Sequence, residues 1–212
     1  VYMSAGEGDA VVNGVLQHWA MFSVFGKLNY GFRDRYLVSF TLRRDASSRF
    51  GKNNRAGYFP AVSVGWRLTE EPWMKKALGK SQVLNNLKFR ASYGINGNDM
   101  INNHATYDMY NLNLVHGGYD FKGTNTGNIT TGAIKTLTGN PNLKWERTDQ
   151  FNIGLDLAMF RNRLTLTVDA YSKYTTNMLQ TKAFLATMGE GATMYSNGAM
   201  ISNIGLEGII SW

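Results

Sequence analysis

The sequence predicts an all-β fold in which an antiparallel sheet forms part of the wall of a transmembrane β-barrel. Seven stretches alternate apolar and polar residues with a period of two, as half-buried strands do. Their connections alternate between short and long, which is typical of barrels that cross a membrane. The polar positions carry too many charges for a packed interior, whereas a water-filled lumen accepts them. A soluble β-sandwich or extracellular barrel, whose sheets also have one apolar face, stays open as the alternative.

The clearest strands form one hairpin. Phe151, Ile153 and Leu155 fall on one side of the first strand, while Asn152 and Asp156 fall on the other. The pattern resumes at once after the three residues 161–163. The same reasoning predicts strands at residues 20–32, 36–43, 59–68, 87–94, 151–160, 164–171 and 197–212.

The long connections are expected at one end of the sheet. They are residues 45–57, 95–147 and 186–196, and the short turns lie at the other end. One departure is residues 69–86, a longer connector at the short-turn end. A short helix is expected there at 73–78, with Thr69 as its N-cap and Pro72 in its first turn.

Strand parity assigns side chains to two faces. The lipid-facing set is Val24, Phe40, Val64, Leu155 and Leu166. The lumen-facing set is Lys27, Thr41, Arg67, Asn152 and Thr167. Aromatic residues near the short-turn end suit an interface girdle: Tyr30, Phe32, Tyr36 and Trp66. Met21 and Phe25 fall on the lumen face, where only a plug inside the barrel would cover them.

The hairpin allows two registers. A turn at Asn162-Arg163 places Asp156 opposite Asp169, a like-charge pair that is unfavourable unless a base such as Arg90 neutralises it. A turn at Arg161-Asn162 places Asp156 opposite Thr167 instead. We expect the second register.

Composition excludes several classes of protein. Hydrophobic residues make up 43% of the 212 residues, and no run of 18 apolar residues provides a transmembrane helix. The net charge of +7 is scattered rather than gathered in a stripe, so no nucleic-acid partner is expected. The first residues lack the pattern of a signal peptide, and the last lie inside a strand pattern. We therefore expect residues 1–212 to be a piece of a longer protein.

No constellation of residues predicts catalysis, a metal site or a cofactor. Glu70 and Glu71 are adjacent, so their side chains diverge, and they suit the first turn of a helix better than acid–base work. Ser47 and Ser48 have no nearby base, and the glycines within 117–132 lack the strand-to-helix context of a phosphate loop. The three histidines lie far apart in sequence: His18, His104 and His116.

Substrate-binding residues are not assigned by the sequence. Four loop aromatics are of interest, since aromatic faces hold sugars but also anchor barrel rims at the membrane interface: Tyr107, Tyr110, Tyr119 and Trp145. The sequence does not choose between these two roles.

Several longer strings go beyond pattern. They are residues 42–51 (LRRDASSRFG), 57–67 (GYFPAVSVGWR), 87–94 (LKFRASYG), 140–146 (NPNLKWE) and the hairpin 152–171. Together they closely resemble the C-terminal part of the β-barrel of SusC/RagA-type TonB-linked outer-membrane transporters. Ala46 and Ala61 stand where that pattern has Gly and Ser.

The resemblance implies a function that the residues alone do not show. It implies a 22-stranded barrel in the cell outer membrane, closed by an N-terminal plug and energised through the TonB complex. It also implies a SusD-like surface lipoprotein as a lid, and import of oligosaccharides or peptides without any cofactor or catalytic role. Residues 1–212 would form a partial barrel domain, with the plug and the TonB box elsewhere. A passive porin and a surface adhesin or binding module are the rival functions.

Overall fold

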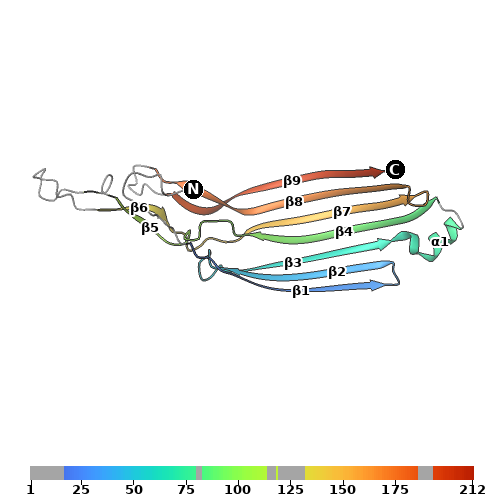
Figure 1. The fold of residues 1–212 in the computed structure, drawn as a ribbon, viewed down its shortest axis with the longest axis horizontal. Coiled ribbons are helices and arrows are strands. Elements are labelled where there is room, and N and C mark those ends of the chain that lie inside the picture. The colour runs from blue at the N-terminus through green and yellow to red at the C-terminus, as the bar shows by residue number, and fades with distance from the viewer. Residues whose placement is uncertain (1–16, 80–82, 114–117, 119–131, 186–192) are drawn as a thin grey trace, which may run out of the picture.

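The computed structural model describes residues 17–79, 83–113, 118, 132–185 and 193–212, which form one long sheet (Figure 1). The strands are β1 (Met21–Phe32), β2 (Tyr36–Ser47), β3 (Ala56–Arg67), β4 (Leu84–Asn98), β5 (Met109–Asn113), β6 (Gly132–Thr138), β7 (Glu146–Met159), β8 (Leu164–Ala183) and β9 (Thr193–Ser211). The helices are a 3₁₀ turn, η2 (Leu68–Glu70), and α1 (Pro72–Leu78). No helix within the described residues is long and apolar enough to span a bilayer.

All seven predicted strands are present, and the sheet order is β1-β2-β3-β4-β7-β8-β9-β6-β5. The described strands pair antiparallel, except that β6 and β9 pair in parallel over two residues. Most strands extend further than predicted at the loop end, so that β2 runs to Ser47 and β8 to Ala183. The prediction missed β5 and β6, which lie inside the long connection 95–147.

The connections divide between the two ends of the sheet as predicted. The turns after β1 and β7 lie at one end together with α1, and the long connections after β2, β4 and β8 lie at the other (Figure 1). Arg33 and Asp34 both have positive φ, the conformation of a tight hairpin turn that matches strand twist. The connection 186–192 lies outside the described residues.

The hairpin of β7 and β8 adopts the expected register. Asp156 lies opposite Thr167, and the last pair before the turn is Met159 with Leu164. Arg161 and Asn162 stand at the centre of the turn with positive φ, which confirms the predicted turn. Asp169 lies opposite Gly154 instead of Asp156.

The connector between β3 and β4 differs from the prediction at its start. Thr69 lies in η2 rather than at the N-cap of the helix, and its hydroxyl accepts a hydrogen bond from the Leu87 backbone N–H at 3.5 Å. Glu71 is the N-cap of α1, and Pro72 occupies the first turn as expected. Glu70 and Glu71 therefore both precede the helix and do not form its first turn.

A small hydrophobic core sits at the loop end of the sheet. It joins the loop after β2, the start of β3 and the connections on either side of β5 and β6. Its buried members are Phe50, Phe59, Ile101, Ala105, Leu143 and Trp145. Gly51 is required there, because a Cβ at this position would lie 2.2 Å from the Pro141 carbonyl oxygen. Three of the strings that carry the family resemblance, 42–51, 57–67 and 140–146, meet in this core.

Candidate functional site

The sheet has two faces of opposite character, fixed by strand register. Residues directly opposite one another in a ladder share a face, so each row across the strands has one chemistry. One apolar row is Tyr30, Val38, Val64, Ala91, Ile153, Ala170 and Leu206. The adjacent polar row is Asn29, Ser39, Ser63, Ser92, Asn152, Tyr171 and Gly205. The ten side chains assigned to two faces from the sequence are distributed over these faces as predicted.

Hydrogen bonds cross the strands along the polar row. The Ser39 hydroxyl donates to Asn29 Oδ1 at 2.8 Å, and Asn152 Nδ2 donates to Ser92 Oγ at 3.2 Å. The Tyr171 ring lies over Gly205, where a Cβ would come within 2.5 Å of the ring. The row therefore presents hydroxyl and amide groups that are held in place by their neighbours.

A charged cluster occupies the next row of the same face. The Arg90 Nε lies 2.8 Å from Asp156 Oδ2, and its Nη2 lies 3.0 Å from Asp169 Oδ2. One guanidinium thus bridges two carboxylates from β7 and β8, as its forked geometry allows. Gly154 leaves room for this bridge, because a Cβ there would lie 2.3 Å from Asp169 Oδ1. The predicted role of Arg90 in neutralising both aspartates is confirmed.

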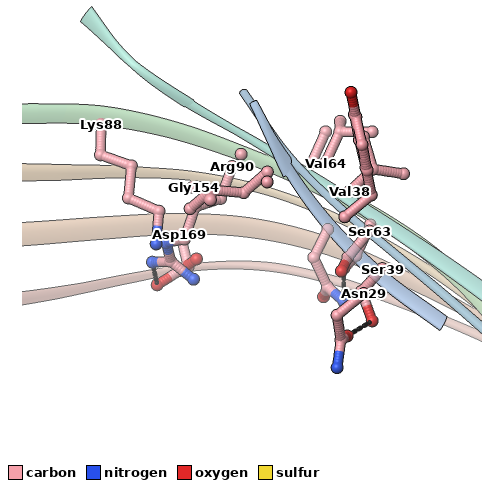
Figure 2. Close-up of a pocket in the computed structure, with 16 residues that line it drawn as sticks. Asn29, Val38, Ser39, Ser63, Val64, Lys88, Arg90, Gly154 and Asp169 are labelled. Atoms are coloured by element: carbon pink, nitrogen blue, oxygen red, sulfur yellow. Dashed lines mark hydrogen bonds and ion pairs between the residues drawn. The ribbon is translucent and has the colours of Figure 1, made fainter. Parts of the chain in front are cut away.

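The polar row and the charged cluster line one hollow of about 490 Å³ on this face. Figure 2 shows Asn29, Ser39 and Ser63 at one end of it and Lys88, Arg90 and Asp169 at the other. Val38 and Val64 point to the opposite side of the sheet (Figure 2). Hydroxyls, amides and paired charges can hydrogen-bond a polar molecule, but no nucleophile in this hollow stands beside a base.

The short-turn rim is organised by the buried carboxylate of Glu71. It accepts hydrogen bonds from Tyr36 Oη at 2.6 Å and from Trp66 Nε1 at 3.1 Å, and Arg35 Nη1 lies 3.6 Å away. The Tyr36 and then the Trp66 hydrogen bond hold the pKa of Glu71 below its usual value. Glu70 turns away and pairs with Lys75 at 2.5 Å, which confirms that the two carboxylates diverge. The sequence signalled neither partner, since Tyr36 and Trp66 lie far from Glu71 along a lipid-type pattern.

The loop aromatics separate into two groups. Trp145 is buried against Phe50 and Phe59, and its indole N–H donates to the Arg55 carbonyl, so it is a core residue. Tyr107 and Tyr110 are exposed, and Tyr119 lies outside the described residues. Trp145 therefore cannot contact a ligand by its ring face, contrary to one of the two roles considered for it.

The other candidates from the sequence do not come together. Ser47 is buried and its hydroxyl donates to Asp99 at 2.8 Å, while Arg49 pairs with the same carboxylate at 3.5 Å. These contacts tie the loop after β2 to the end of β4. Within the described residues, no group of three His, Asp or Glu side chains could hold a metal ion. His116 and nearly all of the glycine-rich stretch 117–132 lie outside those residues.

Comparison with known proteins identifies the family. A family model described as "TonB dependent receptor-like, beta-barrel" matches residues 9–212. The chain is 36% identical over 186 residues to the TonB-dependent receptor SusC of Bacteroides thetaiotaomicron, covering 87% of this chain. The chain belongs to the TonB-dependent receptor β-barrel family. Within that family it is a barrel fragment of the SusC/RagA type, as the resemblance of its motifs predicted.

Other relatives agree. TonB-dependent receptor P39 of Formosa agariphila is 39% identical over 160 residues, which cover 76% of this chain and 14% of that receptor. A solved structure titled as the RagAB peptide importer in the closed-closed state superposes with a TM-score of 0.75 at 31% identity, over 90% of this chain and 19% of that one. The siderophore receptor PirA of Pseudomonas aeruginosa has a TM-score of 0.55 at 16% identity, which shows a shared fold alone. The chain spans 18% of SusC, less than a fifth of its length.

Proposed function

We propose that this chain is part of the wall of an outer-membrane transporter that imports oligosaccharides or peptides by a TonB-dependent route. The observation that carries the proposal is the two-faced sheet: an apolar band on one side, and a hydrogen-bonded polar row with a charged cluster on the other. An antiparallel sheet with short turns at one end and long connections at the other is the architecture of an outer-membrane barrel. The short-turn end would then face the periplasm.

The dimensions of the sheet support the same proposal. β8 and β9 contain 20 and 19 residues, whereas about 9–11 residues cross a bilayer when tilted. The surplus lies toward the loop end, where the buried core ties the long connections together. Strands of this length would carry the wall beyond the outer leaflet and hold the loops above it.

The complete protein would contain parts that these residues do not supply. All of residues 1–212 would belong to the barrel domain, which further strands would close, to 22 in the family pattern. An N-terminal plug would fill the lumen, the TonB complex would energise it, and a SusD-like lipoprotein would act as a lid. Phe25, on the polar face and 74% exposed, is a position that a plug would cover. No catalytic role is proposed.

The substrate class is narrowed by the polar face only to molecules rich in hydrogen-bonding groups. SusC gives its name to one branch of relatives, and RagAB is titled a peptide importer. Sugar hydroxyls and peptide amides would both suit a row of serine hydroxyls and asparagine amides. The proposal therefore keeps both classes.

Uptake by the full-length protein tests the proposal. Cells that express it with its lipoprotein partner are given labelled oligosaccharides and peptides, with TonB present or deleted. We expect uptake of one class that is lost without TonB. Uptake that persists without TonB would indicate a passive porin. Binding of the ligand at the surface without any uptake would indicate an adhesin.

A further inference from the structure

The first turn of α1 lies on the apolar side of the sheet. Tyr36 and Trp66 belong to the apolar face, since they pair with one another and with Phe89 across β2, β3 and β4. Both side chains donate to the Glu71 carboxylate, at 2.6 and 3.1 Å. Because Glu71 is the N-cap of α1, these bonds fix the start of the helix at the rim of the apolar face rather than beneath the polar one.

The helix exposes an apolar surface where its own sheet does not cover it. Trp73 is 55% exposed and Ala77, one turn later, is exposed as well. Met74 and Leu78 are half-buried and face the sheet. At 100° per residue, Lys76 lies beside Trp73 and Ala77, whereas Lys75 lies on the opposite side and pairs with Glu70. An indole with a neighbouring cation thus points away from the protein.

The neighbouring turns at this end have the same composition. The Arg33 guanidinium lies 5.1 Å from the centre of the Phe32 ring, and the Phe160 and Trp212 rings meet edge to face at 6.2 Å. Arg161 and Arg163 occupy the turn beside these rings. Aromatic rings at the edge of an apolar band, with cations just beyond them, match the boundary between acyl chains and anionic headgroups.

We propose that α1 is an interfacial anchor on the periplasmic leaflet of the outer membrane, with Trp73 and Ala77 at the acyl boundary and Lys76 on the phosphates of anionic phospholipids. The proposal rests on the proposed function, because it needs the apolar face in a bilayer. It explains why the longest connector at the short-turn end folds into a helix. A tight turn would join β3 and β4 without it. A short helix with an apolar face and a flanking cation lies in the interface plane rather than across the membrane.

The test measures how deeply α1 lies in a bilayer. The full-length protein, with any other cysteine replaced, is placed in nanodiscs of phosphatidylethanolamine and phosphatidylglycerol. A fluorescent label is attached to Trp73→Cys, or to Lys75→Cys as the matched control on the same helix. Quenching by shallow doxyl lipids is compared with quenching by aqueous iodide. We expect the label at 73 to be quenched about twofold more by the lipid than the label at 75, and less by iodide.

A third label separates failure of this inference from failure of the proposed function. Val64→Cys lies on the apolar face in mid-strand and should be quenched by deep doxyl lipids. If 64 is quenched by lipid while 73 behaves as 75 does, α1 lies in the periplasm and the anchor is wrong. If 64 is not quenched either, the membrane wall itself is wrong and the anchor falls with it.

The contact between Lys76 and phosphate has its own test. Replacing phosphatidylglycerol by phosphatidylcholine should reduce lipid quenching at 73 in the otherwise unchanged protein. Lys76→Gln should abolish that difference between the two lipids, whereas Lys75→Gln should keep it. A difference that survives Lys76→Gln would overturn the phosphate contact.

Discussion

The middle of the sheet and its loop end are built from different kinds of contact. In the middle, large apolar side chains such as Leu28 and Phe40 are exposed by the protein itself, and only register gives them a common face. At the loop end, Phe50 and Leu143 are almost completely buried in a core made of loop residues. The wall therefore depends on lipid as its solvent, while the loop end is stabilised by its own packing. Substitutions should separate the two regions by what each one needs.

The largest effect is expected in the loop-end core. Trp145→Ala removes a ring that packs 5.0 Å from the Phe50 ring and 5.4 Å from the Phe59 ring, and it leaves the Arg55 carbonyl without its donor. We expect a loss of about 3–5 kcal/mol in local stability. Limited proteolysis of the full-length protein should cut the loops faster, while the heat-modifiable migration of the barrel is kept.

The matched control is Tyr107→Ala at the same end. This tyrosine is 58% exposed, so its truncation should change stability by less than about 0.5 kcal/mol. Equal protease sensitivity of the two variants would show that Trp145 does not support the loop end. Loss of the folded barrel in Trp145→Ala would show that the two regions are not independent.

The charged cluster on the polar face should give a smaller effect. Arg90→Gln leaves Asp156 and Asp169 close together without their shared cation. Because all three side chains are about one-third exposed, water screens them, and the expected loss is about 1–2 kcal/mol. Urea unfolding at low and high salt measures it, and salt should reduce the difference.

Two variants sharpen the result for Arg90. Lys27→Gln removes a cation on the same face whose cross-strand partner is the uncharged Thr41, and it should cost little. Asp169→Asn in the Arg90→Gln background should restore part of the loss by removing one of the two repelling charges. No recovery in the double variant would mean that the cluster acts through packing and not through charge.

Much of the wall was predictable from sequence, because its register follows from two local facts. Apolar parity limits the hairpin of β7 and β8 to an even-length turn, and the repulsion between Asp156 and Asp169 selects one of the two choices. The observed pairing of Asp156 with Thr167 confirms both steps. Strand ends were less predictable, since β2 continues to Ser47 after its alternation stops at Arg44.

The loop end and the rim were not predictable in this way. Trp145 is buried only because residues from three distant loops meet around it, and no local pattern marks that meeting. β5 and β6 are short strands in a connection without alternation. Thr69 has the side chain of an N-cap, but the chain forms η2 first, and the role passes to Glu71.

The smallest effect is expected at the rim and depends on pH. Hydrogen bonds from Tyr36 and Trp66, together with Arg35, lower the pKa of Glu71 in the folded protein. A lowered folded-state pKa adds stability that is present above the usual carboxyl pKa of 4.5 and is lost as pH falls through the folded value. The melting temperature of Glu71→Gln should therefore lie below that of the original protein at neutral pH, and the gap should close in acid. A gap that is independent of pH would contradict an ionised Glu71.

The account depends most directly on which face of the sheet meets lipid. Leu155 and Asn152 lie on the same strand but on opposite faces. In the full-length protein, Leu155→Arg places a charge in the bilayer at a cost of about 2–4 kcal/mol, whereas Asn152→Arg places it in water. The yield of folded, heat-modifiable barrel in the outer membrane measures both. A sharp drop for Leu155→Arg with near-normal yield for Asn152→Arg is the predicted result, and equal yields or the reverse order would contradict the assignment of the faces.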